Sequence, residues 1–308
     1  MNQSKPGQRR YVTADVFTDR MFRGNPVAVV LDAAGLSAAQ MQAVAREFNY
    51  IESTFVLPPA DPDHTAQVRI FTPAREVPFA GHPNIGTAFV LARSLLAEGR
   101  EPVRQMVFEE AAGLVPVDLL WTDGVLTGAE LTCPEALSRR GQVSAEQAAA
   151  CLCLAAADIK TDGHLPQVVS VGLPFLVVEL ASRAALRQAR PDKSAYERLL
   201  PLDGAHSVYA YTLALDPDET DCNVQARMFT GFMAEDPATG SATAAMSALL
   251  AELRQSSDLA LCVRQGVDMG RPSTLLTRVA RTPEHGVVVK LGGRCVAVME
   301  GDFTLAGL

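Results

Sequence analysis

The sequence has 308 residues, of which 48% are hydrophobic and 20% are charged, and its formal net charge is −8. This is the balance of an ordinary globular protein, and the length exceeds the roughly 250 residues that one hydrophobic core usually serves, so we expect two domains. The negative charge argues against nucleic acid as a partner. No apolar run approaches the roughly 20 residues of a membrane span, and the N-terminus lacks a signal-peptide stretch, so we expect a cytoplasmic protein.

Strand-like runs rich in Val, Ile, Phe and Thr dominate the chain. In the first half they cover residues 11–17, 27–31, 53–57, 68–72 and 114–119. In the second half they cover residues 167–171, 175–180, 207–213, 223–229, 273–279, 287–291 and 296–299. Their length and their β-branched residues predict strands in both halves.

Helices are fewer but clearly marked. Ser37 with Gln40, and Ser144 with Gln147, have the spacing of a capping box, and each pair opens an Ala-rich helical run. Residues 85–96 and 242–253 carry apolar stripes at helical spacing, and their other positions are mostly small or apolar too. Helices that are apolar nearly all round are usually buried, so we expect a sheet around one central helix in each half.

Segments of the first half recur in the second half in the same order. HPNIGTA, residues 82–88, returns as DPATGSA, residues 236–242, and further pairs are GNP with GLP, RIFT with RMFT and, more loosely, VFEEAAG with VRQGVDMG. We infer a duplicated half and two pseudo-symmetric domains with a cleft between them, residues 1–130 and 131–308. The sequence leaves open whether the last strands belong to the first or the second domain.

The repeated motif predicts where the chemistry lies. Because Pro suits the first turn of a helix, His82 and Asp236 are expected near two N-caps, where free N–H groups attract an anion. Asp236 alone could be a simple N-cap, but His82 is better explained as a neutral donor and acceptor toward a ligand, since the helix dipole disfavours its protonated form. Gly81 and Gly240 allow a ligand to approach closely, although turn geometry also calls for glycine.

Glu52, at the start of a predicted strand, is the candidate base. A Glu at a strand end can be a solvated edge carboxylate, but a proton-transfer enzyme without metal or thiol needs a carboxylate or a histidine. The six cysteines lack C-x-x-C spacing and the five histidines form no H-x-x-x-H pair, so we expect buried, reduced cysteines and no metal. Hydrolase, Walker A and dinucleotide motifs are absent from the sequence, and the helix starts hold no cysteine pair of the kind a two-thiol racemase needs.

The segments DVFTDRMFRGNPVAVV, NYIESTFV, RIFTPAREVPFAGHPNIGTA, AEDPATGSATAA and QGVDMGRPS together resemble the PhzF family of phenazine-biosynthesis-like isomerases, from about Tyr11 to Gly301. The resemblance implies an α+β fold of the diaminopimelate-epimerase type. In this fold two pseudo-symmetric domains each wrap a strand-rich, mostly antiparallel, barrel-like sheet around a central helix. It also implies a homodimer without metal or organic cofactor.

The resemblance implies roles for particular residues. The family's catalytic glutamate falls on Glu52, which would move a proton between carbon atoms, and the polar partners of its Gly-His-Pro and Asp-Pro-Ala-Thr-Gly motifs fall on His82 and Asp236. Gly81, Gly240 and Ser241 match positions that line the substrate cleft. Ile51 replaces the serine that usually precedes the glutamate, and a drier neighbour of this kind raises a carboxyl pKa by desolvation.

The sequence therefore predicts a cofactor-independent isomerase that moves a proton on a small carboxylate-bearing substrate, such as a cyclic amino acid of the dihydro-hydroxyanthranilate type, in the cleft between the domains. The alternative from another class is a binding or interaction protein on the same scaffold with little catalysis. An epimerase is a third option, which the missing cysteine pair disfavours.

Overall fold

The computed structural model describes residues 7–219, 221–282 and 286–305, which form two compact units. Unit 1 takes its residues from 1–131 and 292–308, and unit 2 from 132–291. The last strand, which the predicted ranges 1–130 and 131–308 assigned to the second half, thus groups mainly with unit 1. No helix in the described part of the chain is long and apolar enough to cross a membrane.

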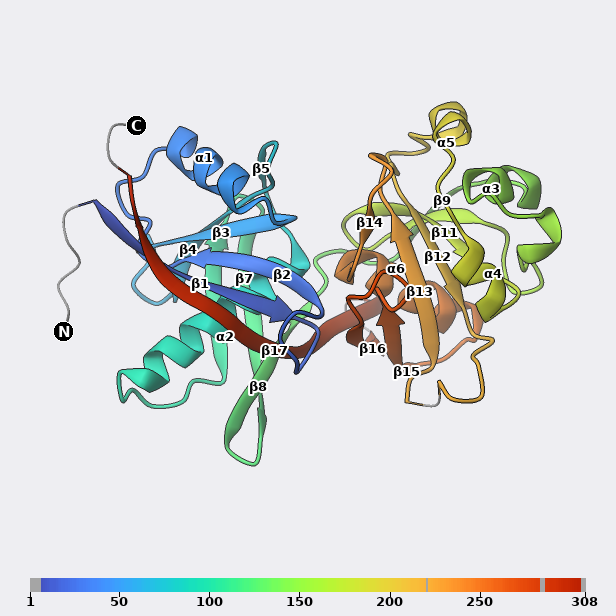
Figure 1. The fold of residues 1–308 in the computed structure, drawn as a ribbon. Coiled ribbons are helices and arrows are strands. Elements are labelled where there is room, and N and C mark those ends of the chain that lie inside the picture. Colours follow the sequence, from blue (N-terminus) through green and yellow to red (C-terminus); the bar gives the residue numbers. More distant parts are fainter. Residues whose placement is uncertain (1–6, 220, 283–285, 306–308) are drawn as a thin grey trace. The chain divides into compact units, whose positions relative to one another are not determined.

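Unit 1 is a closed barrel of eight strands. Around the barrel, each strand pairs with the next in the order β1, β2, β3, β4, β6, β7, β8, β17 and back to β1. The bounds of these strands are β1 Gln8–Val16, β2 Asn25–Val30, β3 Glu52–Leu57, β4 Ala66–Phe71, β6 Gln105–Glu110, β7 Gly113–Thr122, β8 Val125–Thr132 and β17 Gly286–Thr304. Of the barrel pairs whose register is described, two are parallel, β2–β3 and β4–β6, and five are antiparallel, so the sheet is mostly antiparallel as predicted. In Figure 1 the closing pair is the dark blue β1 beside the dark red β17.

One helix, α2 (Gly81–Ala97), packs against β1, β2, β3 and β7 and is buried over most of its length. Gly86 permits this close packing, because a Cβ atom there would lie 2.5 Å from Val27 Cγ1. Helix α1 (Ala38–Phe48) begins with the predicted capping box of Ser37 and Gln40. A short strand, β5 (Glu76–Val77), pairs with β4 and leads toward α2.

Unit 2 contains a run of seven paired strands in the order β9, β10, β11, β12, β13, β15 and β16. Their bounds are β9 Ser138–Gln142, β10 Gln167–Ser170, β11 Pro174–Glu179, β12 Val208–Thr212, β13 Val224–Phe229, β15 Asp258–Gln265 and β16 Ser273–Thr282, with the short β14 (Glu235–Asp236) beside β13. The central helix α6 (Gly240–Leu253) packs against β10, β11, β15 and β16 and is mostly buried. Around it lie α3 (Ala145–Cys151), a 3-10 turn (Ala156–Asp158), α4 (Arg183–Gln188) and α5 (Lys193–Leu199).

The two units repeat one pairing scheme. In unit 1, β2 pairs parallel with β3, β3 antiparallel with β4, β4 antiparallel with β5 and parallel with β6, and β6 antiparallel with β7. In unit 2 the strands β11, β12, β13, β14, β15 and β16 repeat these relations in the same order. The internal repeat inferred from the sequence is therefore a repeat of strand pairing.

The structure corrects the register of the repeated motif. Strands β5 and β14 are equivalent, and in each unit three residues separate that strand from the first residue of the central helix, Gly81 or Gly240. Gly81 therefore corresponds to Gly240, so His82 corresponds to Ser241 and not to Asp236. The N-caps are Ala80 and Thr239, so His82 lies in the first turn of α2 whereas Asp236 precedes α6. The recurring Pro and Gly misled the alignment: Pro83 and Gly86 lie after the start of α2, whereas Pro237 precedes α6 and Gly240 is its first residue.

The cysteine prediction was also partly wrong. Cys222 and Cys262 form a disulfide. Cys262 lies in β15, and Cys222 lies two residues before β13, the parallel neighbour of β15; local spacing does not reveal this proximity over 40 residues. Cys151 and Cys295 are free and buried as expected, but Cys153 is exposed.

Candidate active site

Glu52 is the first residue of β3, and its side chain lies beside the first turn of α2. Its side chain is only 15% exposed, and one carboxyl oxygen lies 3.4 Å from Nδ1 of His82. The structure thus brings together two of the predicted residues from positions 30 apart in the chain. Ile51, the unusual neighbour of Glu52, is itself 38% exposed.

His82 is held in a neutral state by its surroundings. The side chain is 7% exposed, and burial lowers the pKa of the imidazole to about 3, while a hydrogen bond with the Pro26 backbone acts weakly in the opposite direction. Its place in the first turn of α2 also opposes a positive charge, because the helix dipole is positive there. The contact with Glu52 is therefore not an ion pair, and the neutral state of the ring agrees with the expectation from the sequence.

Buried polar atoms without a normal hydrogen bond gather around the start of α2. Within the described residues they include Oγ of Ser53, Nε2 of His82, both amide atoms of Asn84 and both carboxyl oxygens of Glu110. Buried polar groups are nearly always hydrogen-bonded, so a group of exceptions needs an explanation such as a bound ligand or water. The described part of unit 2 has no buried side-chain atom in this state.

Asp236 lies in unit 2 and is fixed by neighbouring side chains. It is 7% exposed, and its Oδ2 accepts a hydrogen bond of 2.5 Å from Oγ1 of Thr239. The buried Gln265 donates to the Asp236 carbonyl oxygen at 2.8 Å and accepts from the Thr239 backbone at 3.1 Å. Ser273, across the hairpin from Gln265, donates to the Pro237 carbonyl oxygen. The Asp-Pro-Ala-Thr turn thus has a defined conformation before any ligand binds.

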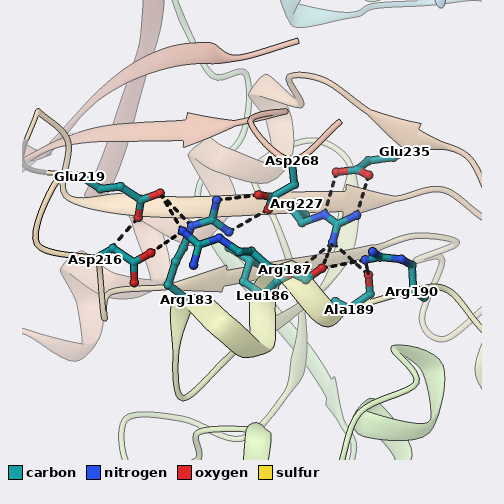
Figure 2. A network of polar contacts seen from close by, with 10 residues as sticks. All are labelled: Arg183, Leu186, Arg187, Ala189, Arg190, Asp216, Glu219, Arg227, Glu235 and Asp268. Carbon is teal, nitrogen blue, oxygen red and sulfur yellow. Dashed lines mark hydrogen bonds and ion pairs between the residues drawn. The ribbon is translucent and has the colours of Figure 1, made fainter. Parts of the chain in front are cut away.

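A network of arginines and carboxylates supports the two segments that flank this turn (Figure 2). Arg227 binds both oxygens of Glu235, the residue before Asp236, and donates to the carbonyl oxygens of Leu186, Arg187 and Ala189 in and just after α4. Arg183, at the start of α4, binds both oxygens of Asp268 at 2.8 Å. Asp268 belongs to the hairpin between Gln265 and Ser273, so one short helix anchors both sides of the turn.

These supporting residues were not predicted from the sequence. Arg183 is 2% exposed and also donates to Glu219, which approaches Arg187, while Arg187 binds Asp216. The network pairs each guanidinium with carboxylates, which offsets the cost of burying charge. The segments RMFT and QGVDMG, which hold Arg227 and Asp268, belong to the repeat identified in the sequence. Helix α4, which contacts Asp268 through Arg183 and Arg227 through backbone carbonyl oxygens, was not predicted.

The predicted glycines lie where the two central helices begin. Gly81 and Gly240 are the first residues of α2 and α6, and Ser241 is the second residue of α6. At each start the backbone N–H groups of the first turn lack intrahelical partners and form an anion-binding end. Glu52, His82 and Gly81 thus lie together in unit 1, and Asp236, Gly240 and Ser241 lie together in unit 2.

Known proteins resemble this chain over nearly its whole length. The sequence profile of the family described as phenazine biosynthesis-like protein, PhzC-PhzF, matches residues 14–301. The chain belongs to the PhzF family. A trans-2,3-dihydro-3-hydroxyanthranilate isomerase of Pseudomonas aeruginosa is 35% identical and covers 95% of this chain and 98% of its own. An uncharacterized isomerase of Mesorhizobium japonicum is 36% identical and covers 96% of this chain and 98% of its own.

The fold agrees with the same family. A Bacillus anthracis protein of the PhzF family superposes with a TM-score of 0.86 over 97% of this chain and 99% of its own, at 22% identity. The predicted strand-rich α+β fold of the epimerase type is therefore confirmed. As a member of the PhzF family the chain is an isomerase.

Proposed function

We propose that this PhzF-family isomerase moves a proton between carbon atoms of a small substrate that carries a carboxylate, with Glu52 as the base and no cofactor. The substrate is of the cyclic amino-acid type, as the name of the Pseudomonas aeruginosa relative suggests. His82 and Asp236 act on the same substrate as polar partners. The N–H groups at the start of a central helix receive the carboxylate, because they combine free donors with the positive end of the helix dipole.

In this reaction the Glu52 carboxylate takes a proton from one carbon and becomes a carboxylic acid. The electron pair left on carbon shifts along the conjugated part of the substrate, and the acid returns the proton at another carbon, so the substrate is isomerised and Glu52 is regenerated. Neutral His82 can donate or accept a hydrogen bond without adding charge to the site. Donors at the helix start stabilise the negative charge that develops on the substrate.

The observation that carries the proposal is the contact of Glu52 and His82 within a group of buried polar atoms that the protein itself does not satisfy. In unit 2, Ser207 is equivalent to Glu52 and Ser241 is equivalent to His82. In unit 1, Val77 is equivalent to Asp236. Each unit thus carries titratable groups that its copy lacks. This asymmetry is what an acid–base site needs, because its groups must differ in proton affinity.

The test is hydrogen exchange in D₂O. The enzyme is incubated with a panel of cyclic amino acids and carboxylates, including trans-2,3-dihydro-3-hydroxyanthranilate, and loss of carbon-bound proton signals is followed by NMR. We expect exchange with the wild type and a loss of at least about 100-fold for Glu52→Gln, in line with the usual contribution of a general base. Glu47→Gln, in the preceding helix, is the matched control and keeps full exchange. Undiminished exchange by Glu52→Gln would refute the proposal.

The second candidate is a binding protein on the same scaffold. It would bind members of the panel, with binding weakened by His82→Ala, and would show no deuterium incorporation into any of them. The buried pair of Glu52 and His82 favours the isomerase, because a carboxylate beside a neutral imidazole suits proton transfer better than the binding of an anion.

A further inference from the structure

Asn84 in α2 and Glu110 in β6 have no part in the proposed reaction. Asn84 is fully buried in the first turns of α2, and Glu110 is the last residue of β6. The two side chains face each other, and the amide favours the ionised carboxyl, yet none of their polar atoms makes a hydrogen bond of normal geometry. Such a pair costs stability unless something else satisfies it.

The duplication shows what each residue would do if its role were structural. The matching strand register of the two units makes Glu110 equivalent to Gln265. Counted from the first residue of each central helix, Asn84 is equivalent to Thr243. The Gln265 amide makes its hydrogen bonds within the turn before α6: it donates to the Asp236 carbonyl oxygen and accepts from the Thr239 backbone N–H. The Thr243 hydroxyl is hydrogen-bonded to the Tyr209 hydroxyl at 2.8 Å. In unit 2 the protein thus satisfies both positions, whereas in unit 1 it leaves both unsatisfied.

We propose that Asn84 and Glu110 form a subsite for the amino group of the substrate. The inference rests on the proposed function and names the class of substrate more narrowly, as a primary amine that also carries a carboxylate. A carboxylate and an amide carbonyl are both acceptors, so they match the three donors of an ammonium group. The helix start supplies only donors, which suit the carboxylate of the same molecule.

The charges around Glu110 fit this role. Burial raises the pKa of Glu110 to about 8, with Asn84 offsetting part of the effect. Its neighbour Glu109 is bound to His64 and to the backbone of Ala60 and Asp61. Near β5, Glu76 is bound by Arg69, and the titratable residue in the first turn of α2 is the neutral His82.

No charged side chain of these elements therefore neutralises Glu110, and an arriving ammonium group would be its first charged partner. Since an opposite charge nearby favours the ionised carboxyl, the bound amine converts Glu110 from acid to carboxylate. At pH 7 an acid with this pKa is about nine-tenths protonated, so binding releases close to one proton to the buffer.

The experiment compares cis-2-aminocyclohexanecarboxylate with cyclohexanecarboxylate and cis-2-hydroxycyclohexanecarboxylate by calorimetry at pH 7, in phosphate and in Tris. For the wild type we expect about tenfold tighter binding of the amine than of cyclohexanecarboxylate, and release of close to one proton with the amine only. Glu110→Gln loses both effects and still binds cyclohexanecarboxylate as the wild type does. Asn84→Ala weakens the amine preference, and Glu109→Gln, the matched control, changes neither effect.

An amine preference that survives in Glu110→Gln, or amine binding without proton release, would overturn the subsite. Tighter binding of the hydroxy acid than of the amine would overturn it too. These failures leave the proposed function standing, because that function is decided by the exchange reaction of Glu52→Gln.

Discussion

The buried carboxyl of Glu110 predicts an unusual dependence of stability on pH. Its pKa is 4.5 in the unfolded chain and about 8 in the folded protein, because burial disfavours its charged form. Below pH 4.5 both states hold the proton and the group contributes no penalty. As pH rises from 4.5 to 8 the unfolded chain loses the proton first, so the folded state loses stability over that window.

The size of the effect follows from the two pKa values. Their difference corresponds to an upper limit of roughly 5 kcal/mol, of which about 3 kcal/mol falls between pH 5 and pH 7.5. Partial exposure of the side chain lowers this figure, and we expect about 2 kcal/mol. Glu110→Gln removes the ionisation and keeps the shape, so the variant should gain this much over the wild type between the two pH values.

The assay is urea unfolding of wild type and variant at pH 5 and pH 7.5. Glu109→Gln, one residue away, is the control: hydrogen bonds from Ala60, Asp61 and His64 lower the pKa of Glu109 to about 2, so its contribution is present at both pH values and the difference from wild type should stay nearly constant. Its carboxylate stabilises the folded state above the ordinary pKa, and that contribution is lost as pH falls toward 2. If the difference between Glu110→Gln and wild type were the same at both pH values, Glu110 would not be a buried acid and the reasoning would fail.

Three further predictions concern other parts of the structure. Burial lowers the pKa of His82 to about 3, so below pH 6.5 the unfolded chain takes up a proton that the folded protein does not, and the folded state loses stability as pH falls. In urea unfolding, His82→Asn should therefore lose less stability than the wild type between pH 7 and pH 4. Arg183→Lys loses a bidentate contact and should slow deuterium exchange about tenfold at unchanged binding of cyclohexanecarboxylate, whereas the exposed Arg278→Lys changes neither; equal rates would contradict the positioning role. Gly24→Ala should cost about 3 kcal/mol of unfolding free energy, since φ is +67° and the added Cβ would lie 2.2 Å from the Val16 carbonyl oxygen, while Gly35→Ala, at φ +81° with open space, should cost only about 1 kcal/mol.

The sequence predicted most of the strands, the two capping boxes and both central helices, because each has a local signal of periodicity or capping. It missed β6, β8, β9 and β15, whose polar and charged residues hide the alternation, and the short helices α4 and α5. It also set the two helix starts in the wrong register. Only strand pairing shows that Val77 and Asp236 are equivalent, since motif similarity follows recurring Pro and Gly and not the position in a sheet.

The candidate site was predictable where residues carry their own chemistry and not where they depend on distant partners. Glu52 and His82 were identified from the sequence, and the structure places them in contact. Glu110 resembled any strand glutamate until its burial and its equivalence with Gln265 were known. Arg183 acts through Asp268, 85 residues further along the chain, and no local pattern announces such a pair.

The closing pair of the unit 1 barrel has a consequence for how the chain is made. Strand β1 begins at Gln8 and pairs with β17 from Cys295 to Thr304, so the barrel cannot close until β17 has been synthesised. Unit 2 is complete by Leu291 and is inserted within the sequence of unit 1. On the ribosome unit 2 can therefore fold once residue 291 has been made, while the barrel that carries Glu52 and His82 stays open until β17 has been synthesised.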